Sequence, residues 1–140
     1  MENIVESIKE TLKLIPILKS SYNVKRNTDE DDPILFVGVA ETNMIEQLRP
    51  VVEEYFGPPY KPAGTGSFWM NLFDSFVKSV GKIRKDQTLF KKDISPNIRL
   101  FCAFWPWGSE PVKTSIRIGI MFDSEAEEEE LKKKIQNFFR

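Results

Sequence analysis

Four consecutive small residues, Gly64-Thr65-Gly66-Ser67, are the stretch best suited to binding an anion. If they open a helix, free backbone N–H groups and the helix dipole can accept a phosphate or a carboxylate, and Lys61 would add a positive charge. The stretch lacks the lysine and spacing of a Walker loop and the three spaced glycines of a dinucleotide-binding turn. Glycines are also needed where a proline-rich loop takes positive φ, so a purely structural role is the simpler interpretation.

A second candidate is the basic segment 78–92, in which six lysines and arginines are opposed only by Asp86. This local charge could hold an anionic partner. Proteins that read single-stranded nucleic acid interleave aromatic rings with basic residues, whereas Phe90 alone offers stacking here. The whole chain carries 20 basic and 21 acidic residues, which gives no general attraction to nucleic acid or to an anionic membrane. We therefore expect a solvated helix end and sheet edge, and no nucleic-acid partner.

Catalytic and metal-binding groups are few. The chain contains no histidine, which removes the commonest general base and metal ligand. Glu41, Asp74 and Asp123 could pair as carboxylates in a cleft, but nothing in their spacing brings them together. The acidic segment 29–32 lacks the alternating spacing, central glycine and distal glutamate of an EF-hand loop. We expect no metal and no cofactor, and the balance favours a protein that is not an enzyme.

The single cysteine, Cys102, cannot form an internal disulfide or a thiolate cluster. It lies in the most apolar strand, where a thiol behaves as a small hydrophobic side chain and its pKa is raised, so a nucleophilic role is not expected. The N-terminus carries no leader of signal type, and the apolar runs are shorter than the ~20 residues needed to span a bilayer. We expect a cytoplasmic protein with no membrane contact.

The sequence Trp105-Pro106-Trp107 ends a predicted strand at Pro106 and leaves Trp107 in a turn with no guaranteed cover. Tyr60 and Phe68 also lie in or beside an irregular segment. Tryptophan is enriched at interfaces but is also highly buried on average, so these rings are either a lid on the core or an adhesive surface. A homodimer is the simplest way to cover such a surface, because one patch then meets its own copy across a two-fold axis.

The elements that must position these groups are organised around residues 97–123, which read as two long strands joined by a Pro/Gly turn. In the first strand apolar residues point to both faces, which predicts an interior strand. In the second strand four apolar residues alternate with a more polar set, which predicts one face packed on helices. The apolar set is Ile116, Ile118, Ile120 and Phe122.

Apolar spacing predicts helices over residues 2–20, 42–56, 67–81 and 124–139. Pro16 should end or kink the first of these near Ile15, and Pro50 is a possible new start for the second. Ser124 and Glu127 form a capping-box pair for the last one. Strands are predicted over 22–26, 34–40 and 87–92, besides the two long ones. The order favours an α+β fold in one domain, 1–140, with helices on one face of a largely antiparallel four- or five-stranded sheet.

Two functions remain open. The favoured one is a non-catalytic binding or assembly module whose contact surface combines the 57–68 loop with the tip of the central hairpin, through Tyr60, Phe68, Trp105 and Trp107. The alternative is a small enzyme or sensor that binds an anionic small molecule through Lys61, Gly64, Thr65, Gly66 and Ser67. The partner in the first case is a second copy of the chain or another protein.

Overall fold

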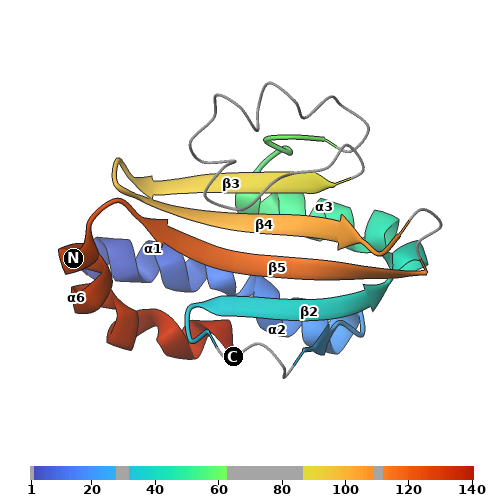
Figure 1. Ribbon diagram of the computed structural model, residues 1–140, viewed down its shortest axis with the longest axis horizontal. Helices are drawn as coiled ribbons and strands as arrows, with labels where there is room; N and C mark the ends of the chain where they lie inside the picture. Colours follow the sequence, from blue (N-terminus) through green and yellow to red (C-terminus); the bar gives the residue numbers. More distant parts are fainter. Residues whose placement is uncertain (1, 28–31, 63–86, 109–111) are drawn as a thin grey trace.

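A five-stranded antiparallel sheet in the order β1-β2-β5-β4-β3 organises the chain (Figure 1). The computed structural model describes residues 2–27, 32–62, 87–108 and 112–140. The strands are β1 (Lys25–Arg26), β2 (Leu35–Glu41), β3 (Thr88–Ser95), β4 (Ile98–Pro106) and β5 (Lys113–Phe122). The predicted interior strand is confirmed, because β4 pairs with β3 on one side and β5 on the other.

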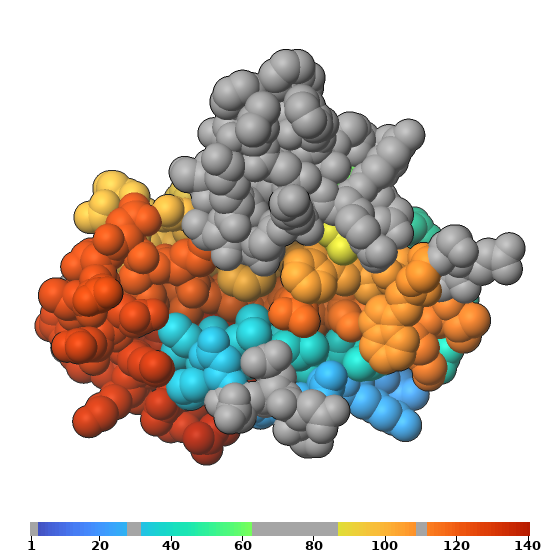
Figure 2. Space-filling view, in the orientation of Figure 1, coloured from blue at the N-terminus to red at the C-terminus, as the bar shows by residue number. Residues whose placement is uncertain are grey.

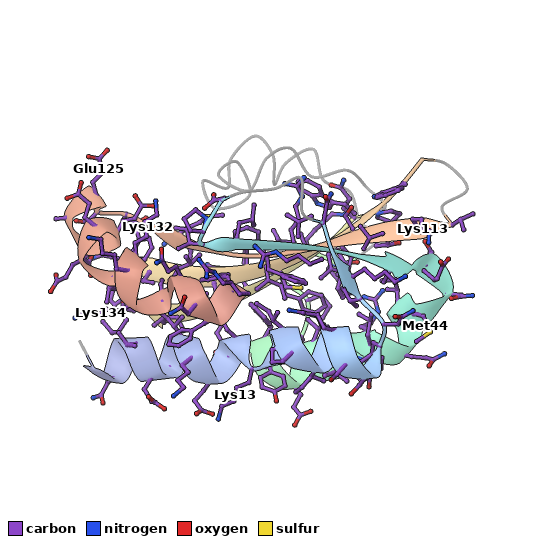
Figure 3. All side chains as sticks on the ribbon, turned by 90° about the horizontal axis from the view of Figure 1, so that it is seen from below. Lys13, Met44, Lys113, Glu125, Lys132 and Lys134 are labelled. Atoms are coloured by element: carbon purple, nitrogen blue, oxygen red, sulfur yellow. The ribbon has the colours of Figure 1, made fainter. Side chains whose placement is uncertain are left out.

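The helices in the described part of the chain lie together on one face of this sheet (Figures 1 and 3). They are α1 (Glu2–Leu12), α2 (Leu14–Ser21), α3 (Ile45–Phe56) and α6 (Glu125–Ile135), with short 3-10 turns at Thr42–Met44 and Gln136–Phe139. The predicted α+β class is confirmed. The helix predicted over residues 67–81 lies outside the described residues. Within the described ranges, no helix is long and apolar enough to cross a bilayer.

Pro16 breaks the N-terminal helix one turn earlier than the predicted position near Ile15. A helical N–H at residue 16 would bond to the carbonyl four residues back, which is that of Leu12, and α1 ends at Leu12. The chain restarts at Leu14, so Pro16 falls in the first turn of α2, where no intrahelical partner is lost. The proline therefore sets the end of one helix and suits the start of the next.

Pro50 lies inside α3 and does not begin a new helix there, contrary to one of the predicted possibilities. Thr42 starts a 3-10 turn and its hydroxyl contacts the Thr114 hydroxyl at 2.9 Å, so it does not cap α3. The proline removes one backbone hydrogen bond. Leu48 and Val52, on either side of it, are both completely buried, and this packing holds the helix together across the proline.

A backbone contact of Asp123 and the predicted cap at Ser124 join the central hairpin to the last helix. Asp123 N–H donates to the Asn97 carbonyl at 2.9 Å and closes the open end of the β4–β5 pair. Directly afterwards, the Ser124 hydroxyl accepts the backbone N–H of Glu127 at 3.4 Å and begins α6. The hairpin and the C-terminal helix thus follow from residues close together in the sequence.

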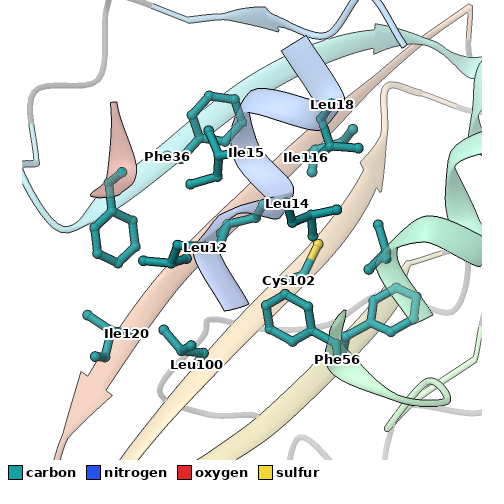
Figure 4. Packing of buried hydrophobic residues seen from close by; sticks show 14 of the residues in the cluster. Leu12, Leu14, Ile15, Leu18, Phe36, Phe56, Leu100, Cys102, Ile116 and Ile120 are labelled. Carbon is teal, nitrogen blue, oxygen red and sulfur yellow. The ribbon is translucent and has the colours of Figure 1, made fainter. Parts of the chain in front are cut away.

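The main core fills the space between the sheet and the helices (Figure 4). Cys102 of β4 lies there with Leu14 of α2 and Ile116 of β5, and all three are completely buried. The side chains of β4 and β5 alternate, so the residues between them point to the opposite face of the sheet. That second face carries its own small cluster of Leu89, Phe101 and Ala103, packed with Leu35, Trp105 and Met121.

Candidate functional site

Trp107 follows directly after β4 and is half exposed, at 51% of its surface. Its indole N–H donates to the Ser115 hydroxyl at 2.7 Å, and its backbone N–H donates to the Lys113 carbonyl at 3.0 Å. The polar atom of the ring is therefore satisfied within the chain, while the apolar surface of the ring faces solvent. A large ring held in one orientation can bind a partner with little loss of conformational entropy.

An exposed ion pair lies beside this ring. Glu41, the last residue of β2, pairs with Lys113, the first residue of β5, both through the strand register and through their side chains. Val112, the preceding residue, is 70% exposed. Together, Glu41, Trp107, Val112, Lys113 and Ser115 form what we call the hairpin-end patch; Figure 3 labels Lys113 at this end of the sheet.

Trp105 is partly buried and differs from Trp107 in what it contacts. The guanidinium of Arg117 lies over its ring, with Cζ 4.3 Å from the ring centroid. The Nε atom of Arg117 and the Nε1 atom of Trp105 are both shielded from solvent, and neither has a hydrogen-bond partner within the described part of the chain. Two N–H donors are thus left unpaired in one stack, a combination that costs folding free energy and is uncommon in native proteins.

Arg117 also lines a hollow of about 260 Å³ near the start of β2, the end of β5 and the first turn of α6. Asp32 and Glu128 contribute carboxylates to the same hollow. Figure 2 looks onto this face of the sheet, with the start of β2 in cyan beside the orange atoms of β4 and β5. Sequence reasoning missed Arg117, whose only local signal is a charged residue between Ile116 and Ile118.

A second hollow, of about 410 Å³, lies on the other side of the molecule between α1 and β3, and its lining includes Glu10, Lys92 and Asp93. Each of these has a partner elsewhere in the chain. Lys92 Nζ donates to the Tyr55 carbonyl at 3.0 Å, Glu10 pairs with Lys13 just beyond the end of α1, and Asp93 pairs with Lys91 of β3. These three side chains are therefore already engaged within the chain, whereas Glu6 adds a further carboxylate to the lining.

Lys61, predicted to assist an anion, is only 1% exposed. Its ammonium donates to the Gln87 carbonyl at 2.6 Å, and its backbone pairs with that of Leu89. The side chain is thus directed at the protein backbone. Gly64, Thr65, Gly66 and Ser67 lie outside the described residues, so the anion site remains a prediction.

Tyr60 and Phe68 are the two other aromatic residues of the predicted interface. Tyr60 is 40% exposed and carries the ammonium of Lys91 over its ring, 5.0 Å from the centroid. Phe68 lies outside the described residues. Of the four predicted interface residues, Trp107 is the most exposed among those described, and Trp105 is stacked under Arg117.

Of the three carboxylates considered for catalysis, the two that the structure describes, Glu41 and Asp123, do not come together. Glu41 is at the Lys113 end of the sheet, whereas Asp123 is at the other end. The Asp123 carboxylate accepts hydrogen bonds from both Nη atoms of Arg99, at 2.7 and 3.5 Å. Asp74 lies outside the described residues. Among the described residues, no three Cys, Asp or Glu side chains are grouped so that they could hold a metal ion.

Cys102 is completely buried, and burial raises the pKa of its thiol. A neutral thiol within an apolar core is neither a nucleophile nor a metal ligand under ordinary conditions. The interpretation of this cysteine as a core residue agrees with its surroundings.

No family model matches the chain, and no similar curated protein or solved structure is found, so a function must be inferred from the residues of the chain itself.

Proposed function

We propose that the chain is a non-catalytic assembly module that pairs with a second copy of itself through the hairpin-end patch. The observation that carries the proposal is the half-exposed ring of Trp107, fixed by its hydrogen bond to Ser115. Exposed aromatic anchors of this kind dominate the binding energy of many interfaces. The cytoplasmic location of the protein stays a prediction.

The charges around Trp107 favour a second copy over an unrelated partner. In a two-fold contact the same patch meets itself, so any charges within it are best matched when both signs are present. Glu41 and Lys113 supply one acid and one base, and their side chains are 48% and 45% exposed. Across a two-fold axis, Lys113 of each copy can face Glu41 of the other, with the two Trp107 rings packed between them.

The 57–68 loop as a contact surface and the alternative function have less support than the hairpin-end patch. Tyr60 could extend the contact surface, because it is 40% exposed. The alternative, an enzyme or sensor with an anionic small molecule at Gly64-Ser67, gains no support from Lys61, whose ammonium is bound to the Gln87 carbonyl. Self-association through Trp107 is therefore the function to test first.

The test compares variants by sedimentation velocity. Trp107→Ala should weaken the dimer by about 30-fold or more, because an interface anchor contributes about 2 kcal/mol. Ser115→Ala keeps the ring but releases its N–H, so it should weaken the dimer less. Each variant must keep a cooperative thermal transition, which separates loss of association from loss of the fold.

Charge reversal adds a sharper comparison. Glu41→Lys and Lys113→Glu should each weaken the dimer, and the double variant should restore it, because the patch is then self-complementary again. The matched control is Arg99→Asp with Asp123→Arg, which exchanges an exposed ion pair at the opposite end of the sheet. Association that responds equally to the control exchange, or that ignores Trp107→Ala, would refute the proposed patch.

A further inference from the structure

The hollow beside Arg117 has opposite charges around it that do not neutralise each other. Arg117 contributes a guanidinium, and Asp32 and Glu128 contribute carboxylates. Within the described residues, no ion pair joins Arg117 to either acid. Charges of opposite sign that face one space without touching leave room for a molecule that carries both charges itself.

Arg117 is prepared to bind a carboxylate. The Trp105 ring holds its guanidinium from one side at 4.3 Å, and the Nε atom is shielded and unpaired. No described residue hydrogen-bonds or ion-pairs with the guanidinium, and Arg117 as a whole is only partly buried. A planar guanidinium binds a carboxylate through two parallel N–H···O bonds, and prior stacking lowers the entropy lost in forming them.

The acids are suited to an ammonium group. Asp32 uses one carboxylate oxygen, Oδ1, to accept the Ile34 N–H at 3.1 Å, which fixes the side chain and leaves the second oxygen available. Glu128 is in the first turn of α6 and is partly buried. Between the charged groups the lining is apolar and includes Leu35, Phe101 and Met121. Such a lining favours an aliphatic side chain.

We propose that this hollow binds a free amino acid with an aliphatic side chain. Its carboxylate would pair with Arg117, its ammonium with Asp32 and Glu128, and its side chain with the apolar lining. The hollow extends from Arg117, in the middle of β5, to Glu128 in α6, whereas the hairpin-end patch is at the Lys113 end of β5; Figure 3 labels Lys113 and Glu125 at opposite ends of the molecule. No residue that lines the hollow belongs to the hairpin-end patch, so the proposal does not rest on self-association.

The test is calorimetric titration with three probes that share the same isobutyl side chain. L-Leucine carries both charges, 4-methylpentanoate lacks the ammonium, and 3-methylbutylamine lacks the carboxylate. Leucine should bind, and each single-charge probe should bind at least about tenfold more weakly, since a hydrogen bond to a charged group is worth about that factor. No heat from leucine at about 10 mM, or equal binding of 4-methylpentanoate, would overturn the proposal.

Variants assign the binding to the hollow. Arg117→Gln and Glu128→Gln should each weaken leucine binding about tenfold or more. Arg49→Gln is the matched control, because Arg49 also lies over an aromatic ring, that of Phe104 at 5.6 Å, but on α3. It should leave leucine binding unchanged. Leucine binding that survives Glu128→Gln and Arg117→Gln, or that is lost equally in Arg49→Gln, would contradict the assignment.

Discussion

The guanidinium of Arg117 lies 4.3 Å from the ring centroid of Trp105, on the face of the sheet opposite the helices. The two residues are on neighbouring strands and offset by two residues along the strands, since Arg117 is opposite Ala103 and Trp105 is opposite Ser115. The attraction between cation and ring is offset by two buried N–H groups without acceptors. The unpaired N–H groups of this stack therefore lower the stability of the fold, and residues at functional sites commonly do so.

Arg117→Met should leave the free energy of unfolding unchanged or raise it by about 1 kcal/mol. Methionine keeps the packing against Trp105 but removes an unpaired buried donor, and replacing buried charge with apolar volume is often neutral or stabilising. Urea unfolding of the variant and of the wild-type protein measures the difference. A loss of about 2 kcal/mol or more would mean that the guanidinium has a stabilising partner.

Gly119→Ala should destabilise the protein by about 1–3 kcal/mol. A Cβ atom at Gly119 would lie 2.6 Å from two ring atoms of Phe101, which is directly opposite in the register. The ring must move to admit the methyl group. In a double-mutant cycle with Phe101→Leu, the second substitution should recover part of the loss. Strict additivity of the two losses would show that the ring does not restrict this position.

The stability of the protein should fall with rising pH above about 8.5 through Cys102. Burial holds the pKa of the folded thiol above its ordinary value, so at high pH only the unfolded state loses the proton. The unfolded state is then favoured by up to about 1.4 kcal/mol per pH unit. Cys102→Ala removes this contribution and not the others, so the difference between the two proteins isolates it.

The measurement is urea unfolding of both proteins at pH 8 and pH 10. Wild type should lose more stability than Cys102→Ala over this interval. Equal losses would mean that the thiol ionises in the folded protein. Rapid reaction of the native protein with a thiol reagent would contradict the burial of Cys102 directly.

The central hairpin, the interior position of β4 and the Ser124 cap were predictable because each depends on residues close in sequence. Alternation of Ile116, Ile118 and Ile120 fixes which side of β5 is buried. The capping pair at Ser124 and Glu127 is similarly local. These patterns specify elements and their faces without any knowledge of distant partners.

Pro16 and Pro50 show that local sequence rules do not fully predict where a helix begins and ends. Pro50 reads as a helix start, but burial of Leu48 and Val52 against the sheet maintains α3 through it. Pro16 was expected to act at its own position, and its effect falls four residues earlier because the missing bond belongs to the Leu12 carbonyl. Tertiary packing decided the first case, and the direction of helical hydrogen bonds decided the second.

The candidate site was only partly predictable. Trp107 was identified because Pro106 ends the strand beside it. The stack of Arg117 on Trp105 depends on the β4–β5 register, and the hollow with Asp32 and Glu128 joins four separate parts of the chain. The contact of Lys61 could not be predicted from the sequence. Its ammonium donates to the Gln87 carbonyl, and no sequence motif identifies a backbone acceptor of this kind.

Sedimentation equilibrium of the wild-type protein over a range of concentrations tests the central claim most directly. The account predicts a weight-average mass that rises with concentration toward twice the 16.3 kDa chain mass, and a midpoint that Trp107→Ala moves to higher concentration. A mass that remains that of a single chain up to about 1 mM would contradict self-association through the hairpin-end patch.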